Sequence, residues 1–269
     1  MENFSWLSAF REMGKRVGEQ MEELFRGSGR GRALGKGAAG DTTLVLDKKA
    51  EDAILAVLEE AHASGQEFTF VSEELGEKEF GNREALILAD PIDGSNNAKY
   101  GLPFYSTALA MATGWKLSDV KLGYIINLGN GDEYWAIKGQ GAYKNGMKIR
   151  CSERVELSMV NVEGSSPKRD LLLAMPLMTA SRKVRCLGST ALDLACLASG
   201  ATDAVLVPSP SRSFDYAAGW LIVQEAGGVV TDTEGNPLGD TVLGLARTKP
   251  LLGASNQSVL DKALKALKG

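Results

Sequence analysis

The feature that most constrains this chain is an apolar run that ends in two acids. Ala85–Ala89 contains only apolar residues, and the chain then continues with Asp90-Pro91-Ile92-Asp93-Gly94-Ser95. A short apolar run bounded by turn residues predicts a buried strand. Pro91 biases Asp90 toward an extended conformation, and Gly94 permits the backbone to approach a ligand closely. Two carboxylates at the exit of a buried strand are hard to explain by helix capping alone, so they indicate a site for one or two hard cations beside an anion.

Length and charge narrow the classes of protein that this chain can belong to. Its 269 residues fit one large domain or two tightly joined ones. The net charge of −4, with no basic cluster flanked by aromatic residues, argues against a nucleic-acid partner. No apolar run is long enough to span a membrane, and the charged N-terminal segment does not resemble a signal peptide. We therefore expect neither nucleic acid nor a membrane as a partner.

The cysteines and the histidine exclude several kinds of site. Cys151, Cys186 and Cys196 show no zinc-binding or CxxC spacing, so we expect buried, reduced thiols and a cytoplasmic protein. His62 is the only histidine, which excludes multi-histidine metal sites, and we expect it on the surface near the end of a helix. The chemistry must then rest on carboxylates, hydroxyls, amides and bound metal.

The pattern of apolar residues predicts alternating helices and strands. Helices are expected over the first 25 or so residues and at 47–63, 171–178, 191–198, 216–226 and 257–267, and strands at 42–46, 68–71, 85–89, 157–162, 184–187, 204–207 and 228–231, with a β-rich stretch from 106 to 149. The Gly-rich segment 27–40 lacks the spacing of a phosphate-binding P-loop, so we expect a flexible loop from which Lys36 can still reach a phosphate. The change of pattern divides the chain into residues 1–146 and 147–269.

Four acidic positions fall at the ends of predicted elements. They are Asp47, Glu73-Glu74, the pair Asp90 and Asp93, and Asp215. Taken singly, Asp47 and Asp215 are explained as well by helix capping, and Glu73-Glu74 by a solvated turn. Only the pair after the apolar strand demands a functional explanation by itself.

Several motifs nevertheless resemble those of the inositol monophosphatase and fructose-1,6-bisphosphatase superfamily. Residues 90–97 are similar to its DPxDGTxN signature, Ser72-Glu73-Glu74 to its paired-glutamate motif, residues 188–193 to a helix-opening segment, and residues 214–219 to its WDxAAG motif. The resemblance extends in order from about Leu44 to Gly228 and is greatest to archaeal members that act on both inositol monophosphate and fructose 1,6-bisphosphate. It implies an α+β protein built as a layered αβαβα sandwich, with an α+β first half and an α/β second half, and a homodimer.

The resemblance also implies a Mg²⁺-dependent phosphatase acting on small phosphate esters of sugars or cyclitols. Glu73, Asp90 and the carbonyl of Ile92 would hold one Mg²⁺. Asp90, Asp93 and Asp215 would hold a second, and Glu73 could contribute to a third. Oxygen ligands of this kind select Mg²⁺, with Mn²⁺ also possible, over zinc.

The same resemblance assigns the reacting groups. Asp47 and Ser95 would orient a water that attacks phosphorus directly, while Asp93 and the N–H groups of Gly94 and Ser95 would face the substrate. One metal would lower the pKa of the water and the other would stabilise the leaving alkoxide.

Some positions depart from the family pattern and bear on the substrate. Ser95 replaces the usual Thr, and Phe214 the usual Trp. Pro208 stands where inositol-selective animal enzymes carry an acid, whereas Arg185, Thr190 and Arg212 match pocket positions of the archaeal members. An arginine facing a second phosphate favours a bisphosphate, so we expect fructose 1,6-bisphosphate to be hydrolysed at least as well as inositol 1-phosphate. For Arg212 alone, a solvated side chain in a Pro-rich loop is an equal alternative.

Two other functions remain open at this point. The first is a phosphatase of the same superfamily that acts on 3′-phosphoadenosine phosphate or NADP, which would need a platform for adenine that the sequence does not reveal. The second is a non-catalytic protein that binds metal or sugar phosphate. The retention of every acid in the set argues against this second alternative.

Overall fold

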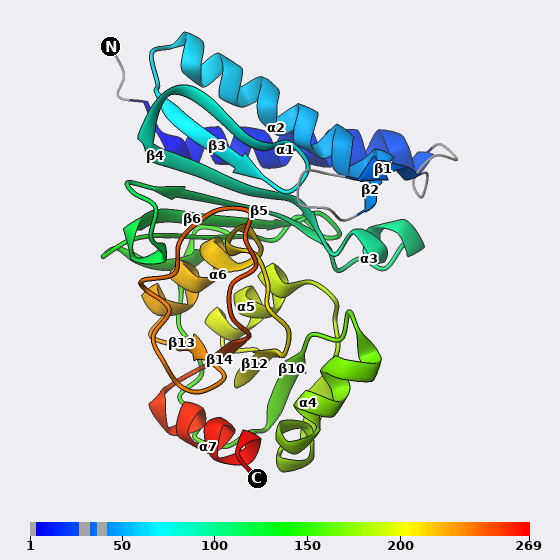
Figure 1. Cartoon of the computed structure of the whole chain (residues 1–269), viewed down its shortest axis with the longest axis vertical. Helices are drawn as coiled ribbons and strands as arrows, with labels where there is room; N and C mark the ends of the chain where they lie inside the picture. The colour runs from blue at the N-terminus through cyan, green and yellow to red at the C-terminus, as the bar shows by residue number, and fades with distance from the viewer. Residues whose placement is uncertain (1–3, 27–32, 37–41) are drawn as a thin grey trace.

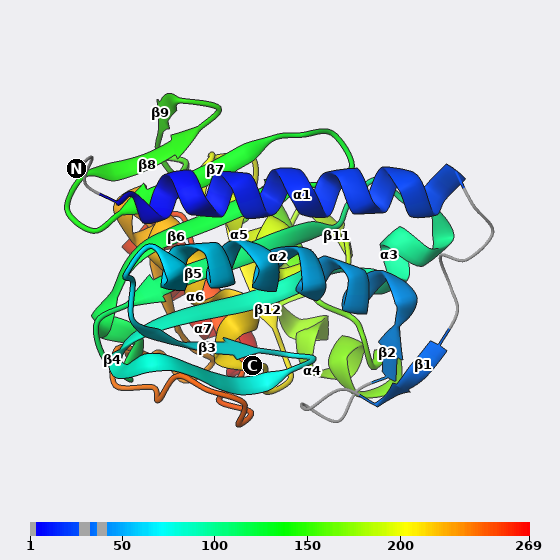
Figure 2. The same ribbon diagram turned by 90° about the horizontal axis from the view of Figure 1, so that it is seen from above.

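The computed structural model describes residues 4–26, 33–36 and 42–269 as a stack of helical and sheet layers. In Figure 1, α1 (Trp6–Arg26) and α2 (Val45–Ala63) cover the outer face of the first sheet, and Figure 2 shows the two helices side by side. α5 (Thr190–Ala198) and α6 (Ser213–Glu225) lie between the first and second sheets, and α4 (Pro167–Ala180) and α7 (Gln257–Leu267) lie beyond the second. This order of layers confirms the αβαβα sandwich.

The strands form two main sheets and a short hairpin. The seven-stranded sheet has the order β3-β4-β5-β6-β7-β8-β9, and the five-stranded sheet the order β11-β10-β12-β14-β13. The strands of the first sheet are β3 (Phe68–Ser72), β4 (Gly76–Asp93), β5 (Ser106–Ala112), β6 (Val120–Asn127), β7 (Glu133–Ile137), β8 (Gly141–Lys144) and β9 (Met147–Ile149). Those of the second are β10 (Met159–Val162), β11 (Lys183–Arg185), β12 (Ala204–Val207), β13 (Val229–Asp232) and β14 (Leu251–Ala254), while β1 (Ala33–Lys36) pairs with β2 (Thr42–Leu44).

Apolar periodicity explains how the layers pack. α1 is amphipathic and buries one face, with Phe10, Met13 and Val17, against the first sheet. α6 instead buries side chains all round, including Tyr216 and Trp220, because it lies between the two sheets. The apolar residues of the middle layer therefore join the two halves into one packed body.

Most of the expected elements are confirmed, and the differences are local. The strand expected at 42–46 ends at Leu44 because α2 already begins at Val45. β14 was missed; its short apolar run Leu251–Ala254 pairs antiparallel with both β12 and β13. The loop predicted at 27–40 is wrong for Ala33–Lys36, which forms a strand, and the rest of that segment and the reach of the Lys36 side chain lie outside the described residues.

Three further expectations can be compared with the structure. His62 is exposed, as predicted. All three cysteines are free thiols, but only Cys151 is buried; Cys186 is exposed, so the expectation of three buried thiols is wrong there. Cys186 follows β11 at the edge of the second sheet, where fewer neighbours cover its side chain. Among the helices that the structure describes, none has the length and apolarity needed to cross a membrane.

Candidate functional site

Strand pairing brings together two acids that lie far apart in the sequence. The second part of β4 runs parallel to β3, with Thr69 opposite Leu86 and Ser72 opposite Ala89. Glu73 and Asp90 are the next residues on the two strands, so both carboxylates emerge at the same edge of the sheet. The charge of Glu73 raises the pKa of Asp90, as expected for two carboxylates that lie near one another. The apolar run and the paired glutamates thus meet as the motifs predicted.

Asp90 lies in surroundings that are unfavourable for a charged side chain. It is only 4% exposed, and its Oδ1 has no hydrogen-bond partner among the residues that the structure describes. A buried carboxylate oxygen without a donor costs free energy, so such an atom calls for an explanation. A bound cation is one, since it would satisfy this oxygen directly.

Asp93, in contrast, is held by the start of α5. Ser189 Oγ donates to Asp93 Oδ2 at 2.5 Å, and the Ala191 N–H donates to the same oxygen at 2.7 Å. These partners come from the second half of the chain, nearly one hundred residues further on. The site is therefore completed only when the two halves pack together.

Asp47 and Asp215 occupy equivalent positions in two helices. Each is the third residue of its helix, and each accepts a 2.8 Å hydrogen bond from the backbone N–H just before the helix: Asp47 from Leu44, and Asp215 from Arg212. This is half of a capping box. Asp47 and Asp215 therefore do cap their helices. Both also raise the pKa of Asp90 electrostatically, so they belong to the same acidic group. We call Asp47, Glu73, Asp90, Asp93 and Asp215 the acidic cluster.

Burial and mutual repulsion raise the pKa values in the acidic cluster. Burial, followed by the charges of Asp215, Glu74 and Asp47, raises the pKa of Glu73 to about 8, although Arg212 opposes the shift. Burial raises the pKa of Asp47 to about 7, with a smaller contribution from Glu74. Burial likewise raises the pKa of Asp93 to about 7 in spite of its two hydrogen bonds, and the pKa of Asp90 lies well above its usual value. Perturbed carboxylates gathered in this way are typical of functional sites.

The donor set fits a hard divalent cation, although the carboxylates are not gathered tightly. Among the described residues, no three His, Cys, Asp or Glu side chains stand close enough to form a ready-made metal centre. The all-oxygen chemistry, the burial and the unpartnered Asp90 Oδ1 nevertheless match what Mg²⁺ or Mn²⁺ requires.

Gly94 allows the backbone after Asp93 to turn in a crowded space. Its φ is 87°, and a Cβ there would lie 3.0 Å from the Gly188 carbonyl oxygen and 3.1 Å from that of Phe104. Ser95 then begins the short helix α3 (Ser95–Tyr100) and is half-buried. No hydrogen bond joins the described side chains of Asp47 and Ser95. Their pairing around a water stays a prediction.

The residues expected to line the substrate pocket differ in their surroundings. Arg212 is only 6% exposed, and its Nη1 lies 3.9 Å from Glu73 Oε1, so it is not a solvated loop arginine. Arg185 is exposed and donates to the carbonyl of its neighbour Val184 at 2.9 Å. Thr190 and Pro208 are both buried. Arg212 therefore adjoins the acidic cluster itself, while Arg185 is the arginine with a free approach from solvent.

Two polar residues near the acidic cluster, Glu51 and Asn97, have contacts that the sequence did not predict, although Asn97 is part of the signature at residues 90–97. Glu51, 1% exposed, accepts hydrogen bonds from Ser72 Oγ and from the Leu75 N–H at 2.8 Å, and so fastens the turn that carries Glu73. Its spacing from Asp47 along the buried face of α2 was an available signal, because a carboxylate on an apolar face needs a partner. Asn97 donates to the carbonyls of Phe104 and Leu187 at 2.7 and 2.6 Å. Nothing in the sequence revealed that these carbonyls would converge.

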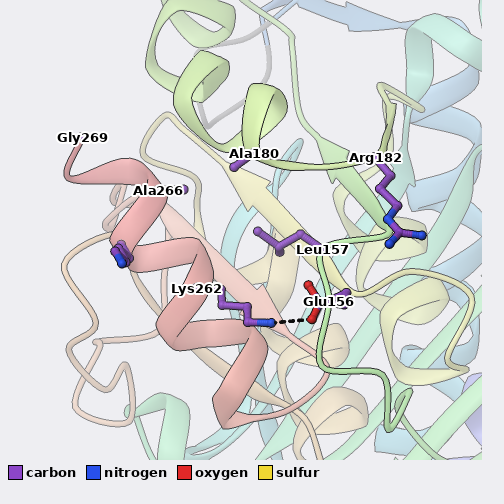
Figure 3. A pocket seen from close by; sticks show the side chains of 8 residues that line it. Glu156, Leu157, Ala180, Arg182, Lys262, Ala266 and Gly269 are labelled. Carbon is purple, nitrogen blue, oxygen red and sulfur yellow. Dashed lines mark hydrogen bonds and ion pairs between the residues drawn. The ribbon is translucent and has the colours of Figure 1, made fainter.

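A cavity of about 420 Å³ lies away from the acidic cluster, at the far end of the second half. Figure 3 shows it between α7 and the end of α4, lined by Leu157, Ala180 and Ala266 together with Arg182, Lys262, Lys265, Glu156 and Gly269. Lys262 Nζ pairs with Glu156 at 2.9 Å inside it. None of the acids of the cluster lines this cavity, so volume alone does not identify the reaction site.

Comparison with known proteins decides the family. The model of the "Inositol monophosphatase family" matches residues 3–268, which is nearly the whole chain. The chain belongs to the inositol monophosphatase family. Its fold, its motifs and its relatives identify this family member as a phosphatase of the inositol monophosphatase and fructose-1,6-bisphosphatase type.

Three relatives illustrate the range of this family. A fructose-1,6-bisphosphatase/inositol-1-monophosphatase of Methanothermobacter thermautotrophicus is 32% identical over 98% of this chain and 97% of its own length. A bifunctional NADP phosphatase/NAD kinase of Methanococcus maripaludis is 32% identical over 74% of this chain and 38% of its own length. A solved inositol monophosphatase-fructose 1,6-bisphosphatase superposes with a TM-score of 0.84 at 28% identity, covering 98% of this chain and all of the other. The fold predicted by resemblance is thus confirmed by a structure that covers 98% of this chain.

Proposed function

We propose that this phosphatase hydrolyses phosphate monoesters of sugars or cyclitols by direct attack of water, with divalent cations held in the acidic cluster. The observation that carries the proposal is Asp90: a buried carboxylate with an unpartnered oxygen, surrounded by Glu73, Asp93 and Asp215. Such crowding of acids destabilises the protein unless a cation offsets it. The arrangement is therefore better suited to binding than to structural support.

The proposed ligands are those that the family resemblance implies. Glu73, Asp90 and the Ile92 carbonyl would hold one cation, and Asp90, Asp93 and Asp215 a second, with a third possible at Glu73. Mg²⁺ is the cation we propose, with Mn²⁺ as an effective substitute. When bound, the cations supply Lewis-acid chemistry, which lowers the pKa of water and offsets charge on the phosphate.

The protein's own groups would position the reactants. Asp47 and Ser95 would orient the attacking water, with Asp47 fixed by its bond to the Leu44 N–H. The Gly94 and Ser95 N–H groups, at the start of α3, would receive phosphate oxygens. Positioning and charge neutralisation of this kind account for most of the catalysis in phosphoryl transfer.

The test is cation-dependent release of phosphate. The protein would be freed of metal and assayed with fructose 1,6-bisphosphate, inositol 1-phosphate, NADP and 3′-phosphoadenosine phosphate, with and without Mg²⁺. We expect turnover of the sugar or cyclitol esters only with cation, and none by Asp93→Asn, with a circular-dichroism spectrum like that of the wild type. Phosphate release by Asp93→Asn at the wild-type rate would contradict the proposed cation site.

For the substrate, we propose that a bisphosphate is used at least as well as inositol 1-phosphate. The side chain of Pro208 supplies no acceptor for ring hydroxyls, and Arg185 offers an exposed charge at the end of β11. Because Arg212 adjoins Glu73, its removal would disturb the acidic cluster as well as the substrate, so Arg185→Ala is the better test. We expect it to lower kcat/KM for fructose 1,6-bisphosphate more than for inositol 1-phosphate. Equal losses of kcat/KM for both esters would show that Arg185 does not determine substrate specificity.

A second candidate function is hydrolysis of NADP, which the similarity to the bifunctional NADP phosphatase/NAD kinase favours. The same panel of esters decides between the two. NADP as the best substrate by kcat/KM would replace the sugar and cyclitol esters in the proposal.

We also propose that the enzyme is a homodimer. α4 exposes Leu172, Leu173 and Met175 at 67%, 52% and 50%, while its other face is packed through Ala174 and Leu177. Neighbouring exposed apolar side chains of this size are typical of an interface. Light scattering at micromolar concentration should give twice the mass of 28.6 kDa, and Leu172→Glu should shift it toward one copy. A monomer in the wild type would contradict this proposal.

A further inference from the structure

We propose that Ser189 is a positioning residue, whose hydroxyl holds Asp93 so that one carboxylate oxygen is committed to the protein and the other faces the cation. This inference rests on the proposed role of Asp93 in binding a cation. It assigns to the second half of the chain a direct influence on cation affinity. No motif in the sequence assigned a role to Ser189.

The hydrogen bonds around Asp93 are directed at a single oxygen. Ser189 Oγ and the Ala191 N–H both donate to Oδ2, at 2.5 and 2.7 Å, and neither involves Oδ1. Two donors on one oxygen fix the rotation of the carboxylate about its bond to the chain.

Ser189 itself is tightly constrained. It is fully buried and is the N-cap of α5, where its Oγ accepts from the Leu192 N–H at 3.3 Å. The hydroxyl proton is thereby free for Asp93, because the bond to Leu192 uses only a lone pair. Ser106 Oγ lies 3.4 Å away on β5. The Ser189 hydroxyl therefore lies close to residues of β4, β5 and α5 at once.

Separate contacts fasten the two segments that this bond connects. Asn97 Nδ2 donates to the Leu187 carbonyl at 2.6 Å, and Gly94 packs directly against Gly188 and Ser189. These contacts do not use the Ser189 hydroxyl. Removing that hydroxyl should therefore leave the Ala191 N–H as the remaining donor to Asp93 Oδ2, and so loosen the carboxylate, without separating α5 from the turn after β4.

A purely structural role makes a different prediction. Loss of an N-cap lowers stability whether or not a metal site is nearby. Loss of a group that orients a metal ligand typically lowers metal affinity by roughly 10–100-fold. Stability and cation affinity, measured on the same variants, therefore separate the two roles.

The experiment measures binding of Mn²⁺ alone to the full-length, metal-free protein. Electron paramagnetic resonance of free Mn²⁺ gives the Kd without any assay of turnover. The variants are Ser189→Ala, Ser189→Thr, which keeps the hydroxyl, and Ser189→Cys, which keeps the shape but donates weakly. The matched control is Asn256→Ala, because Asn256 is the N-cap of α7 and accepts from the Val259 N–H at 3.1 Å, remote from the acidic cluster.

We expect Ser189→Ala to raise the Kd for Mn²⁺ by roughly 10–100-fold, Ser189→Cys to shift it in the same direction, and Ser189→Thr to keep it within about threefold of the wild type. The Mg²⁺ concentration needed for half-maximal phosphate release should rise in parallel, with KM for the ester unchanged at saturating Mg²⁺. Asn256→Ala should lower Tm and leave the Kd unchanged. If Ser189→Ala fails to fold, Ser189→Cys carries the same comparison.

The outcomes distinguish this inference from the proposed function. Wild-type Mn²⁺ affinity in both Ser189→Ala and Ser189→Cys would overturn the positioning role alone, provided that Asp93→Asn weakens binding. Wild-type Mn²⁺ affinity in Asp93→Asn would instead overturn the cation site on which the inference rests. A fall in Mn²⁺ affinity in Asn256→Ala equal to that in Ser189→Ala would show that both effects arise from general destabilisation, and would likewise overturn it.

Discussion

Asp90 and Asp232 are buried to the same degree, at 4% and 3% exposure, but their surroundings are opposite. Asp232, at the end of β13, accepts hydrogen bonds from Lys249 Nζ at 2.9 Å, from Asn236 through both its side chain and its backbone, and from the Glu234 N–H at 3.0 Å. Asp90 has neighbouring acids and an oxygen without a partner. The fold therefore supplies hydrogen-bond donors to the buried carboxylate of Asp232, but it supplies none to Asp90 Oδ1.

The pKa values express the same contrast. Burial acts against ionisation of Asp232, but hydrogen bonds from Lys249 and Asn236 outweigh it and lower its pKa to about 2. Burial and the charge of Glu73 raise the pKa of Asp90 well above its usual value. A charged carboxylate with donors stabilises the fold, whereas a buried carboxylate without donors favours its neutral form unless a cation binds to it. Four predictions test this division, from the largest expected effect to the smallest.

The largest effect is expected when the unsatisfied carboxylate is neutralised. Asp90→Asn should lower phosphate release by at least about 100-fold, because it removes a charged ligand shared by both proposed cations. The Tm of the metal-free variant at pH 8 should equal or exceed that of the wild type, because a repelled charge is gone. Steady-state kinetics measures the loss of phosphate release, and calorimetry measures the Tm. A metal-free Asp90→Asn protein that is much less stable than the wild type would mean that Asp90 is structural.

The stability of the metal-free protein should depend on pH with opposite signs in two ranges. Unfolded acids ionise near pH 4. Folded Asp47, Glu73 and Asp93 keep their protons to about pH 7 or 8, so the folded state binds more protons and stability should fall as pH rises from 4 to 8. Asp232, with a pKa of about 2, stabilises the fold above pH 4, and its contribution is lost as pH falls toward 2.

Urea unfolding across pH, with and without saturating Mg²⁺, checks this prediction. Mg²⁺ should flatten the fall between pH 4 and 8, since a bound cation offsets the repelling charges. Mg²⁺ should leave the loss of stability below pH 4 unchanged. A metal-free protein that is equally stable at pH 5 and pH 8 would contradict the raised pKa values of the acidic cluster.

Neutralising the satisfied carboxylate should have the reverse consequence. Asp232→Asn should cost about 1.5–3 kcal/mol of unfolding free energy, the usual value of a hydrogen bond to a charged group. Its kcat and KM should match those of the wild type, because Asp232 lies outside the acidic cluster. Urea titration and a phosphate-release assay measure both. A catalytic defect as large as that of Asp90→Asn would remove the distinction between the two carboxylates.

The smallest effect concerns a single donor. Asn236→Ala removes the side-chain bond to Asp232 Oδ2 but leaves Lys249 and the backbone donors in place. We expect a loss of about 1 kcal/mol at pH 7, which should be smaller at pH 2, where about half of Asp232 is protonated. Calorimetry at pH 7 and pH 2 gives the comparison. An equal loss at both values would show that the bond does not depend on the charge of Asp232.

How far the sequence predicted this protein depended on how local each feature is. Helices with a clear apolar face were found because their periodicity lies in consecutive residues: α7 was placed to the residue, and α1 was recognised although it begins only at Trp6. β14 was missed because four apolar residues, Leu251–Ala254, do not by themselves distinguish a buried strand from a loop. Cys186 was expected to be buried by residue type, but its place after an edge strand decides its exposure.

The same division holds at the site. The pair Asp90 and Asp93 after an apolar strand was sufficient by itself to indicate a cation site, because few structural roles suit two acids there. Glu51 and Ser189 were not found, since their importance comes from partners 21 to 96 residues away. Arg212 was expected to be either solvated or facing the substrate, and only packing showed that it adjoins Glu73.

By itself, then, the sequence determined which chemical groups this protein has and where most helices and strands lie, because these are local properties, and its family motifs implied the layered fold that carries them. The tertiary structure alone decided which carboxylates received donors and which did not. The β3–β4 register set Glu73 beside Asp90, and the packing of the second half against the first brought Ser189 to Asp93. Charge, burial and hydrogen bonding act through space, so whether a buried acid is a support or a ligand depends on neighbours that the chain order does not reveal.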